Sequence, residues 1–67
     1  EGFEYEVLLG AGETLKKTRN IIIEISLENI DKVRELIFSY DFNLVEVGEP
    51  RDNTQYHLFK KTKASEN

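Results

Sequence analysis

Apolar residues in this 67-residue chain alternate between helical and strand spacing, and the pattern predicts five elements. Residues 3–17 carry apolar side chains at helical intervals, and residues 21–26 have the β-branched composition of a strand. Helical spacing returns over residues 28–40, and residues 43–48 and 55–61 again have strand patterns. The predicted order is therefore helix, strand, helix, strand, strand.

The first helix has two weak points, Gly10 and Gly12, because each glycine costs about 1 kcal/mol relative to alanine inside a helix. Their spacing favours either close backbone packing or a helix end near residues 11–12. One stripe of this helix is apolar, and it consists of Phe3, Val7, Leu8, Ala11 and Leu15. We expect residues upstream of Glu1 to cover that stripe, which indicates the C-terminal piece of a larger protein.

The three strands can be ordered from the faces of their side chains. Residues 21–48 form a strand–helix–strand unit, so strands 21–26 and 43–48 should run parallel with a right-handed crossover. Isoleucines on both faces of strand 21–26 are typical of a strand covered on both sides. Strand 55–61 carries bulky side chains on both faces, which favours a central position, whereas Glu46 in strand 43–48 favours an edge. The predicted fold class is α/β, with a three-stranded mixed sheet in the order 21–26, 55–61, 43–48 and the last strand antiparallel.

Length and composition restrict the classes of protein further. The length allows one domain, predicted at residues 1–61, followed by a disordered tail at residues 62–67. A net charge of −4 argues against a dedicated nucleic-acid binder, whose usual mark is a basic face. The absence of cysteine and the single histidine argue against a zinc or iron site. The longest purely apolar run has three residues, so we expect a cytoplasmic protein without a membrane span.

Few residues have the surroundings that catalysis requires. His57 lies mid-strand with no Ser or Cys at a recognisable spacing, which favours a half-buried structural histidine. Glu4 and Glu6 are expected to be solvated acids at a helix start. The segment Gly10-Ala11-Gly12-Glu13 resembles half of a phosphate-binding loop, but it lacks the preceding strand and a third glycine. A short basic tail, Lys60, Lys61 and Lys63, is expected to aid solubility.

Glu1 is the candidate catalytic residue. Ligands of open α/β sheets bind outside the carboxyl ends of parallel strands. If a parallel strand precedes residue 1, Glu1 lies at the carboxyl end of that strand, where an active-site acid belongs. The alternative of equal weight is that Glu1 only begins the helix.

The chain resembles the C-terminal part of FkbM-type methyltransferases over roughly residues 1–61. Members of that family typically read Asp-x-Glu-Gly-x-Glu-x-x-Val-Leu-x-Gly-Ala, then a helix and an apolar strand that ends in Glu. Glu1 and Gly2 match the Glu-Gly of that pattern, and Val7-Leu8 through Ala11 match its continuation. Four later segments also fit the family, and they are Ile21-Ile22-Ile23-Glu24-Ile25, Val33-Arg34-Glu35-Leu36, Phe42-Asn43-Leu44 and Tyr56-His57-Leu58-Phe59. Leu9 replaces a usually polar residue of the family, and Asp41 replaces a common glycine.

The resemblance implies S-adenosylmethionine-dependent methyl transfer, commonly to a hydroxyl, on a seven-stranded Rossmann-like sheet. Such sheets end with a reversed strand between the fifth and sixth strands, which is the order derived above. The resemblance also implies that the cofactor-binding half of the domain lies upstream. We therefore expect no catalysis and no cofactor binding by these 67 residues alone, and the methyl acceptor is not indicated.

Two other functions compete with a methyltransferase segment. The chain could be a free-standing α/β binding or oligomerisation module, or a ferredoxin-like regulatory domain. The ferredoxin-like alternative is disfavoured because only three strands are visible and the helices do not follow the split pattern. Apart from the upstream half of the domain, the expected partner is a second copy of the chain, because one face of the sheet and the edge of strand 21–26 would be bare.

Overall fold

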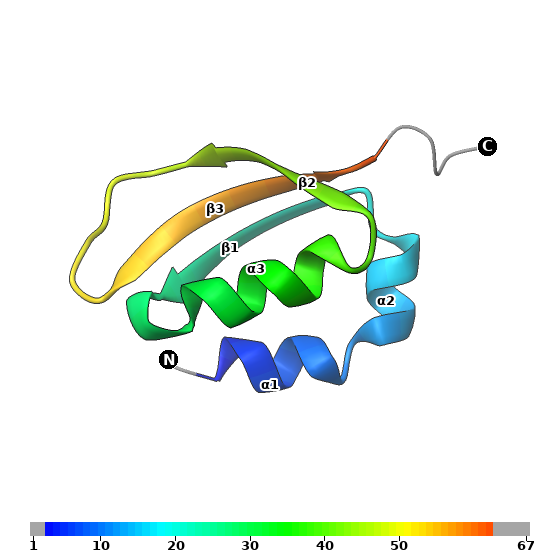
Figure 1. Ribbon diagram of the computed structural model, residues 1–67, viewed down its shortest axis with the longest axis horizontal. Helices are drawn as coiled ribbons and strands as arrows, with labels where there is room; N and C mark the ends of the chain where they lie inside the picture. The colour runs from blue at the N-terminus through cyan, green and yellow to red at the C-terminus, as the bar shows by residue number, and fades with distance from the viewer. Residues whose placement is uncertain (1–2, 63–67) are drawn as a thin grey trace.

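Three antiparallel strands form the sheet that organises residues 3–62, the part of the chain that the computed structural model describes. They are β1 (Asn20–Ser26), β2 (Phe42–Val47) and β3 (Thr54–Lys61), in the order β1-β3-β2 (Figure 1). The prediction that the last strand is central is confirmed. The prediction of a mixed sheet is wrong for the described residues, because β1 and β2 both pair antiparallel with β3 and do not pair with each other.

The predicted helix over residues 3–17 is two short helices. α1 (Glu4–Leu9) ends at Gly10, and α2 (Gly12–Lys17) begins two residues later. The two glycines were predicted to cause either an early helix end or close backbone packing, and the structure shows both. The helix ends early, and a Cβ atom on Gly12 would lie 2.9 Å from the Tyr40 hydroxyl oxygen, so Gly12 also permits close packing.

The crossover from β1 to β2 consists of a 3₁₀ turn, η1 (Leu27–Asn29), and α3 (Ile30–Phe38). Apolar residues at helical spacing on α3 turn toward the core, with Val33 and Ile37 fully buried. Asp41 follows the helix with a φ of 68°, the left-handed conformation that favours glycine and that Asp tolerates better than most residues. Ser26 precedes η1 and Asn29 precedes α3, and neither side chain makes a cap hydrogen bond there.

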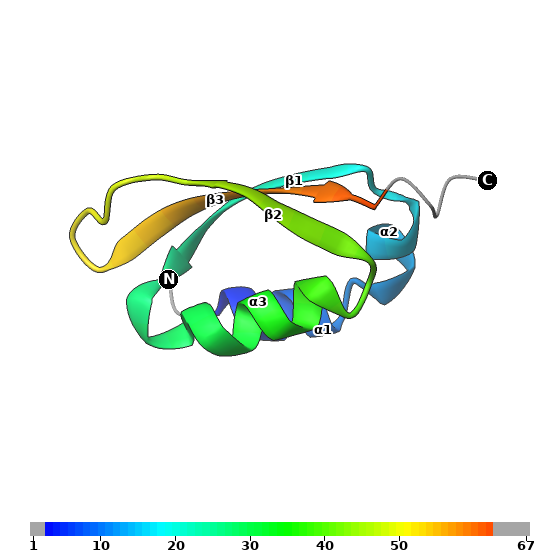
Figure 2. The ribbon, with the colours of Figure 1, turned by 45° about the horizontal axis from the view of Figure 1, so that its top comes forward.

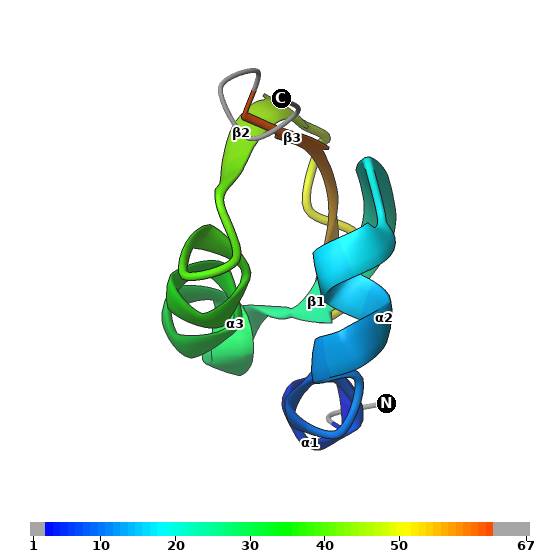
Figure 3. The same ribbon diagram turned by 90° about the vertical axis from the view of Figure 1, so that its right-hand side faces the viewer.

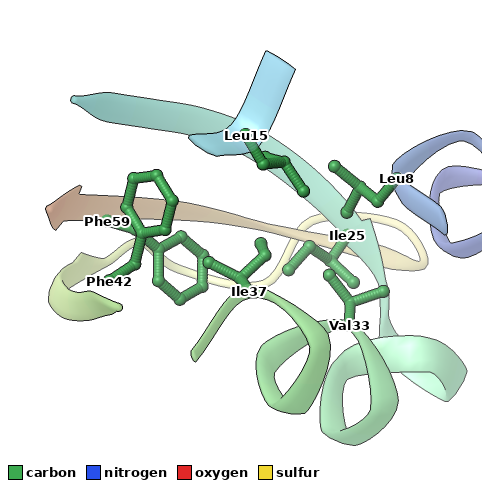
Figure 4. Packing of buried hydrophobic residues seen from close by; sticks show 7 residues of the cluster. All are labelled: Leu8, Leu15, Ile25, Val33, Ile37, Phe42 and Phe59. Atoms are coloured by element: carbon green, nitrogen blue, oxygen red, sulfur yellow. The ribbon is translucent and has the colours of Figure 1, made fainter. Parts of the chain in front are cut away.

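The core lies between α3 and the face of the sheet that the helices cover (Figures 2 and 4). Its seven buried apolar residues come from every helix and strand, and they are Leu8, Leu15, Ile25, Val33, Ile37, Phe42 and Phe59. The apolar stripe predicted on the first helix is divided. Leu8 and Leu15 are buried, but Phe3 is 70% exposed and Val7 is 65% exposed.

No helix of the described chain covers the other face of the sheet (Figure 3). Ile22 of β1 is 67% exposed and Val45 of β2 is 52% exposed, and β3 contributes Leu58, which pairs with Ile22. Within residues 3–62 β1 is therefore covered on one face only, which agrees with the expectation that one face of the sheet is bare. Two carboxylates, Glu24 and Glu46, make this face partly polar, because they pair with outward-facing residues of β3.

Lys61 joins the C-terminal ends of two helices to the sheet. Its Nζ donates to the carbonyl oxygens of Leu15 at 2.9 Å and Tyr40 at 3.1 Å, and it lies 4.2 Å from the centre of the Phe42 ring. A cation is favoured at a helix C-terminus because the last carbonyl groups lack helical partners. The expectation that Lys61 belongs to a solvated basic tail is therefore wrong.

The chain beyond Lys61 is described for one more residue. The Thr62 backbone N–H and side-chain hydroxyl each donate to the Asp41 carbonyl oxygen at 2.7 Å. Residues 63–67, the rest of the predicted disordered tail, lie outside the described residues. No helix within residues 3–62 is long and apolar enough to cross a membrane.

Candidate functional site

The carboxyl ends of β1 and β2 lie at one edge of the sheet, beside the loop from β2 to β3 (Figure 1). Both strands run in the same direction because each is antiparallel to β3. The start of α3 also lies at this edge, since η1 follows β1 directly. In open α/β sheets with parallel strands, ligands bind at the edge where the carboxyl ends of the strands lie.

Backbone hydrogen bonds fix the loop at this edge. Arg51 and Thr54 exchange two of them, at 2.8 and 2.9 Å, and Asp52 between them has a φ of 54°. The Leu27 N–H donates to the Asn53 carbonyl oxygen at 2.8 Å, which attaches the loop to η1. The loop is therefore held both within itself and against the end of β1.

An open pocket lies beside this loop, on the face of the sheet that the helices leave bare. Its lining combines carboxylates, a guanidinium, a hydroxyl and a phenol, and the residues are Glu24, Glu49, Arg51, Thr54 and Tyr56. Gly48 allows the Tyr56 ring to lie against the backbone, because a Cβ atom there would be 3.2 Å from the ring. Within residues 3–62 the only ion pair joins Lys16 to Glu13, so Arg51 does not neutralise either acid of the pocket. Such a set can exchange hydrogen bonds with a polar, hydroxyl-bearing ligand.

Glu4 connects the first turn of α1 to the same edge. Its Oε2 accepts hydrogen bonds from the Ser26 backbone N–H at 2.7 Å and from the Asn29 side-chain amide at 3.2 Å. Burial alone would raise the pKa of the Glu4 carboxyl, but the hydrogen bonds, of which that from the Ser26 N–H is the strongest, lower it from 4.5 to about 2. The prediction that Glu4 is a solvated acid is wrong, whereas Glu6 is exposed as expected.

His57 is completely buried on the helix-covered face, and both ring nitrogens have partners. Arg34 Nε donates to His57 Nε2 at 3.1 Å, and His57 Nδ1 lies 3.1 Å from the Gln55 carbonyl oxygen. Because a guanidinium can only donate, Nε2 is the acceptor and the ring proton resides on Nδ1. The ring also stacks on Phe59, with centroids 5.8 Å apart. The structural role predicted for His57 is confirmed, although the ring is fully rather than half buried.

Glu1, the predicted catalytic residue, and Gly2 lie outside the described residues. What the structure adds is the position of α1, which Glu4 holds at the carboxyl end of β1. The sequence did contain a signal for the contacts that the prediction missed. Glu4 stands one turn before the buried Leu8, and Arg34 stands one turn after Ile30 on the core-facing stripe of α3.

The described residues do not form a binding loop for S-adenosylmethionine. Gly10 ends α1, Gly12 packs against Tyr40, and Gly48 packs against Tyr56. None of the three lies in a glycine-rich turn that leads from a strand into a helix, as a nucleotide-binding loop requires.

Metal chemistry has no evident site in this part of the chain. No group of three His, Asp or Glu side chains in residues 3–62 is arranged to hold a metal ion. No protein-family model, no curated protein and no solved structure matches this chain. The local geometry and the sequence pattern are thus the basis for a functional proposal.

Proposed function

We propose that residues 1–61 are the C-terminal part of an S-adenosylmethionine-dependent methyltransferase domain of FkbM type, which transfers a methyl group to a hydroxyl. The observation that supports this best is the strand order β1-β3-β2, with the last strand reversed between two strands that run in one direction. The last three strands of a Rossmann-like methyltransferase sheet have this arrangement. In the complete sheet of such a domain, a further strand would pair parallel with β1 at its free edge. That pairing would make the sheet mixed.

Two further observations agree with the proposal. The exposed Phe3 and Val7 on α1 and the exposed Ile22 on β1 are apolar surfaces that the upstream part of such a domain would cover. The pocket beside the β2–β3 loop lies at the carboxyl edge, where the hydroxyl-bearing acceptor of such an enzyme would approach. In this proposal Glu1 contributes its carboxylate at the same edge, and these 67 residues alone do not catalyse.

A free-standing binding or oligomerisation module is the second candidate, and one observation favours it. The seven buried apolar residues form one continuous core, and no buried side-chain polar atom in the described residues lacks a hydrogen-bond partner. A unit with a closed core and satisfied polar groups can fold without further chain.

The proposal predicts a specific effect of Glu1→Gln in the longer protein that carries this segment. Loss of the Glu1 carboxylate should lower methyl transfer from labelled S-adenosylmethionine at least about 100-fold, the lower range for one acid–base group. The melting temperature should change little, because Gln has nearly the same volume as Glu. Glu6→Gln, which changes an exposed acid of α1, is the matched control and should retain activity. Activity near wild type in both variants would leave Glu1 as an ordinary acid at a helix start.

A further inference from the structure

We propose that the hydrogen bond from Arg34 to His57 makes the docking of α3 on the sheet sensitive to mild acid. The proposal is independent of the methyltransferase assignment, because it uses only contacts within residues 3–62. It starts from the position of the ring, which is fully buried between α3 and the sheet and stacked on Phe59. Phe59 in turn contacts the ring of Phe38, at the end of α3, edge to face at 5.9 Å.

Protonation reverses the role of one ring nitrogen. In the neutral ring Nε2 accepts the Arg34 Nε–H, and Nδ1–H donates to the Gln55 carbonyl oxygen. In the imidazolium both nitrogens are donors, so Nε2–H would point at the Arg34 N–H, and two cations would face each other at the same separation. The contact that holds α3 to β3 at this point would become repulsive.

No carboxylate within residues 3–62 contacts the ring to offset that repulsion. On α3 the side chains of Asp31, Lys32 and Glu35 are exposed. Glu24 of β1 and Glu46 of β2 pair with Tyr56 and Leu58, the neighbours of His57 along β3, and therefore project from the opposite face of the sheet. Arg34 is thus the charged group that acts on His57. Burial of the ring and the Arg34 charge hold its pKa below the usual value of 6.5, and they outweigh the opposite effect of the Gln55 carbonyl.

The sign of the pH effect follows from the pKa of His57, which is lower in the folded chain than in the unfolded chain. Below pH 6.5 the unfolded chain binds a proton at His57 that the folded chain does not, so stability falls as the pH decreases through that value. His57 is the only histidine in the chain. Carboxylates have ordinary pKa values near 4 and the α-amino group near 8, so His57 is the group that titrates within the interval from pH 7 to pH 5, and a variant without the imidazole measures what the other groups contribute.

Urea unfolding at pH 7 and pH 5 tests the proposal. The folding equilibrium constant of the wild type should decrease by at least about 3-fold, up to the roughly 25-fold limit that a pKa of 6.5 in the unfolded chain sets. His57→Gln supplies an amide oxygen as a non-titrating acceptor, and its constant should change less than about 2-fold. Arg34→Met should show a smaller pH effect than the wild type. Arg51→Met, which removes a loop arginine away from His57, should retain the wild-type effect.

Nitrogen chemical shifts of the wild-type ring provide a readout that does not depend on any variant. The expected result at pH 7 is a proton on Nδ1 and none on Nε2, with less protonation of the ring at pH 6 than a histidine with the usual pKa of 6.5 would show. A proton on Nε2, or a wild-type stability that changes less than 2-fold between pH 7 and pH 5, would overturn the proposal.

Discussion

Glu4 shows at the scale of a single residue how a charge can replace a conventional helix cap. The chain turns from β1 into η1 and α3 without a side-chain cap from Ser26 or Asn29. The Glu4 carboxylate, from an element 22 residues earlier, accepts the Ser26 N–H instead. The hydrophobic pattern places Glu4 one turn before the buried Leu8, but it does not identify Ser26 as the partner, because that depends on how α1 is placed beside the end of β1.

Replacing Glu4 with Gln should destabilise the fold by about 1–2 kcal/mol, since hydrogen bonds to a charged group contribute more than neutral ones. The exposed Glu6→Gln is the control and should stay within about 0.5 kcal/mol of wild type in urea unfolding. Equal effects of the two substitutions would mean that the Glu4 contacts do not contribute in solution.

The lowered pKa of Glu4 predicts that the folded state loses stability in acid. Because the pKa of Glu4 is lowered from 4.5 to about 2, its contribution is complete above pH 4.5 and is lost as the pH falls toward 2. Wild-type unfolding curves between pH 5 and pH 2.5 should therefore show a steeper loss of stability than those of Glu4→Gln. Parallel curves for the two proteins would contradict the assignment.

At the scale of elements, the sequence predicted those parts of the fold that depend on local pattern. The three strands, the reversed central strand and the helix between β1 and β2 follow from residue spacing and from the faces of β3. Asp41, which stands where the resemblance has a glycine, adopts the left-handed conformation that favours glycine. The contacts of Glu4, Arg34 and Lys61 were not predicted, since each joins elements far apart in sequence and depends on their packing.

Lys61 provides the test at this scale. Lys61→Met keeps the aliphatic stem but removes the cation that bonds the ends of α2 and α3, so we expect a loss of about 1–3 kcal/mol. Lys60→Met, at the exposed neighbouring position, is the matched control and should change stability by less than about 0.5 kcal/mol. If urea unfolding gave equal effects for both variants, Lys61 would be no more than a solvated lysine.

At the scale of the whole molecule, the two faces of the sheet differ. The helices cover one face, and the other presents Ile22, Val45 and Leu58 together with Glu24 and Glu46. β1 is also an edge strand in the described sheet. Apolar surface beside an unpaired strand edge favours association, because burial contributes about 25 cal/mol per Å².

We therefore expect a homodimer or larger oligomer of these 67 residues at micromolar concentration in sedimentation velocity. Ile22→Lys should shift the population toward monomer, because Ile22 lies both on the bare face and on the edge strand. Val7→Lys, equally exposed but on α1, should leave the association unchanged. A compact wild-type monomer would show that the two glutamates keep this face solvated.

The proposed membership of a larger methyltransferase domain is tested most directly by isothermal titration of S-adenosylmethionine into two proteins. One is the 67-residue chain, and the other is the full translation product of the coding sequence that contains it. The proposal predicts stoichiometric, micromolar binding, about −8 kcal/mol, for the full product and none for the chain alone. Binding of that strength by the chain alone, or its absence in the full product, would contradict the proposal.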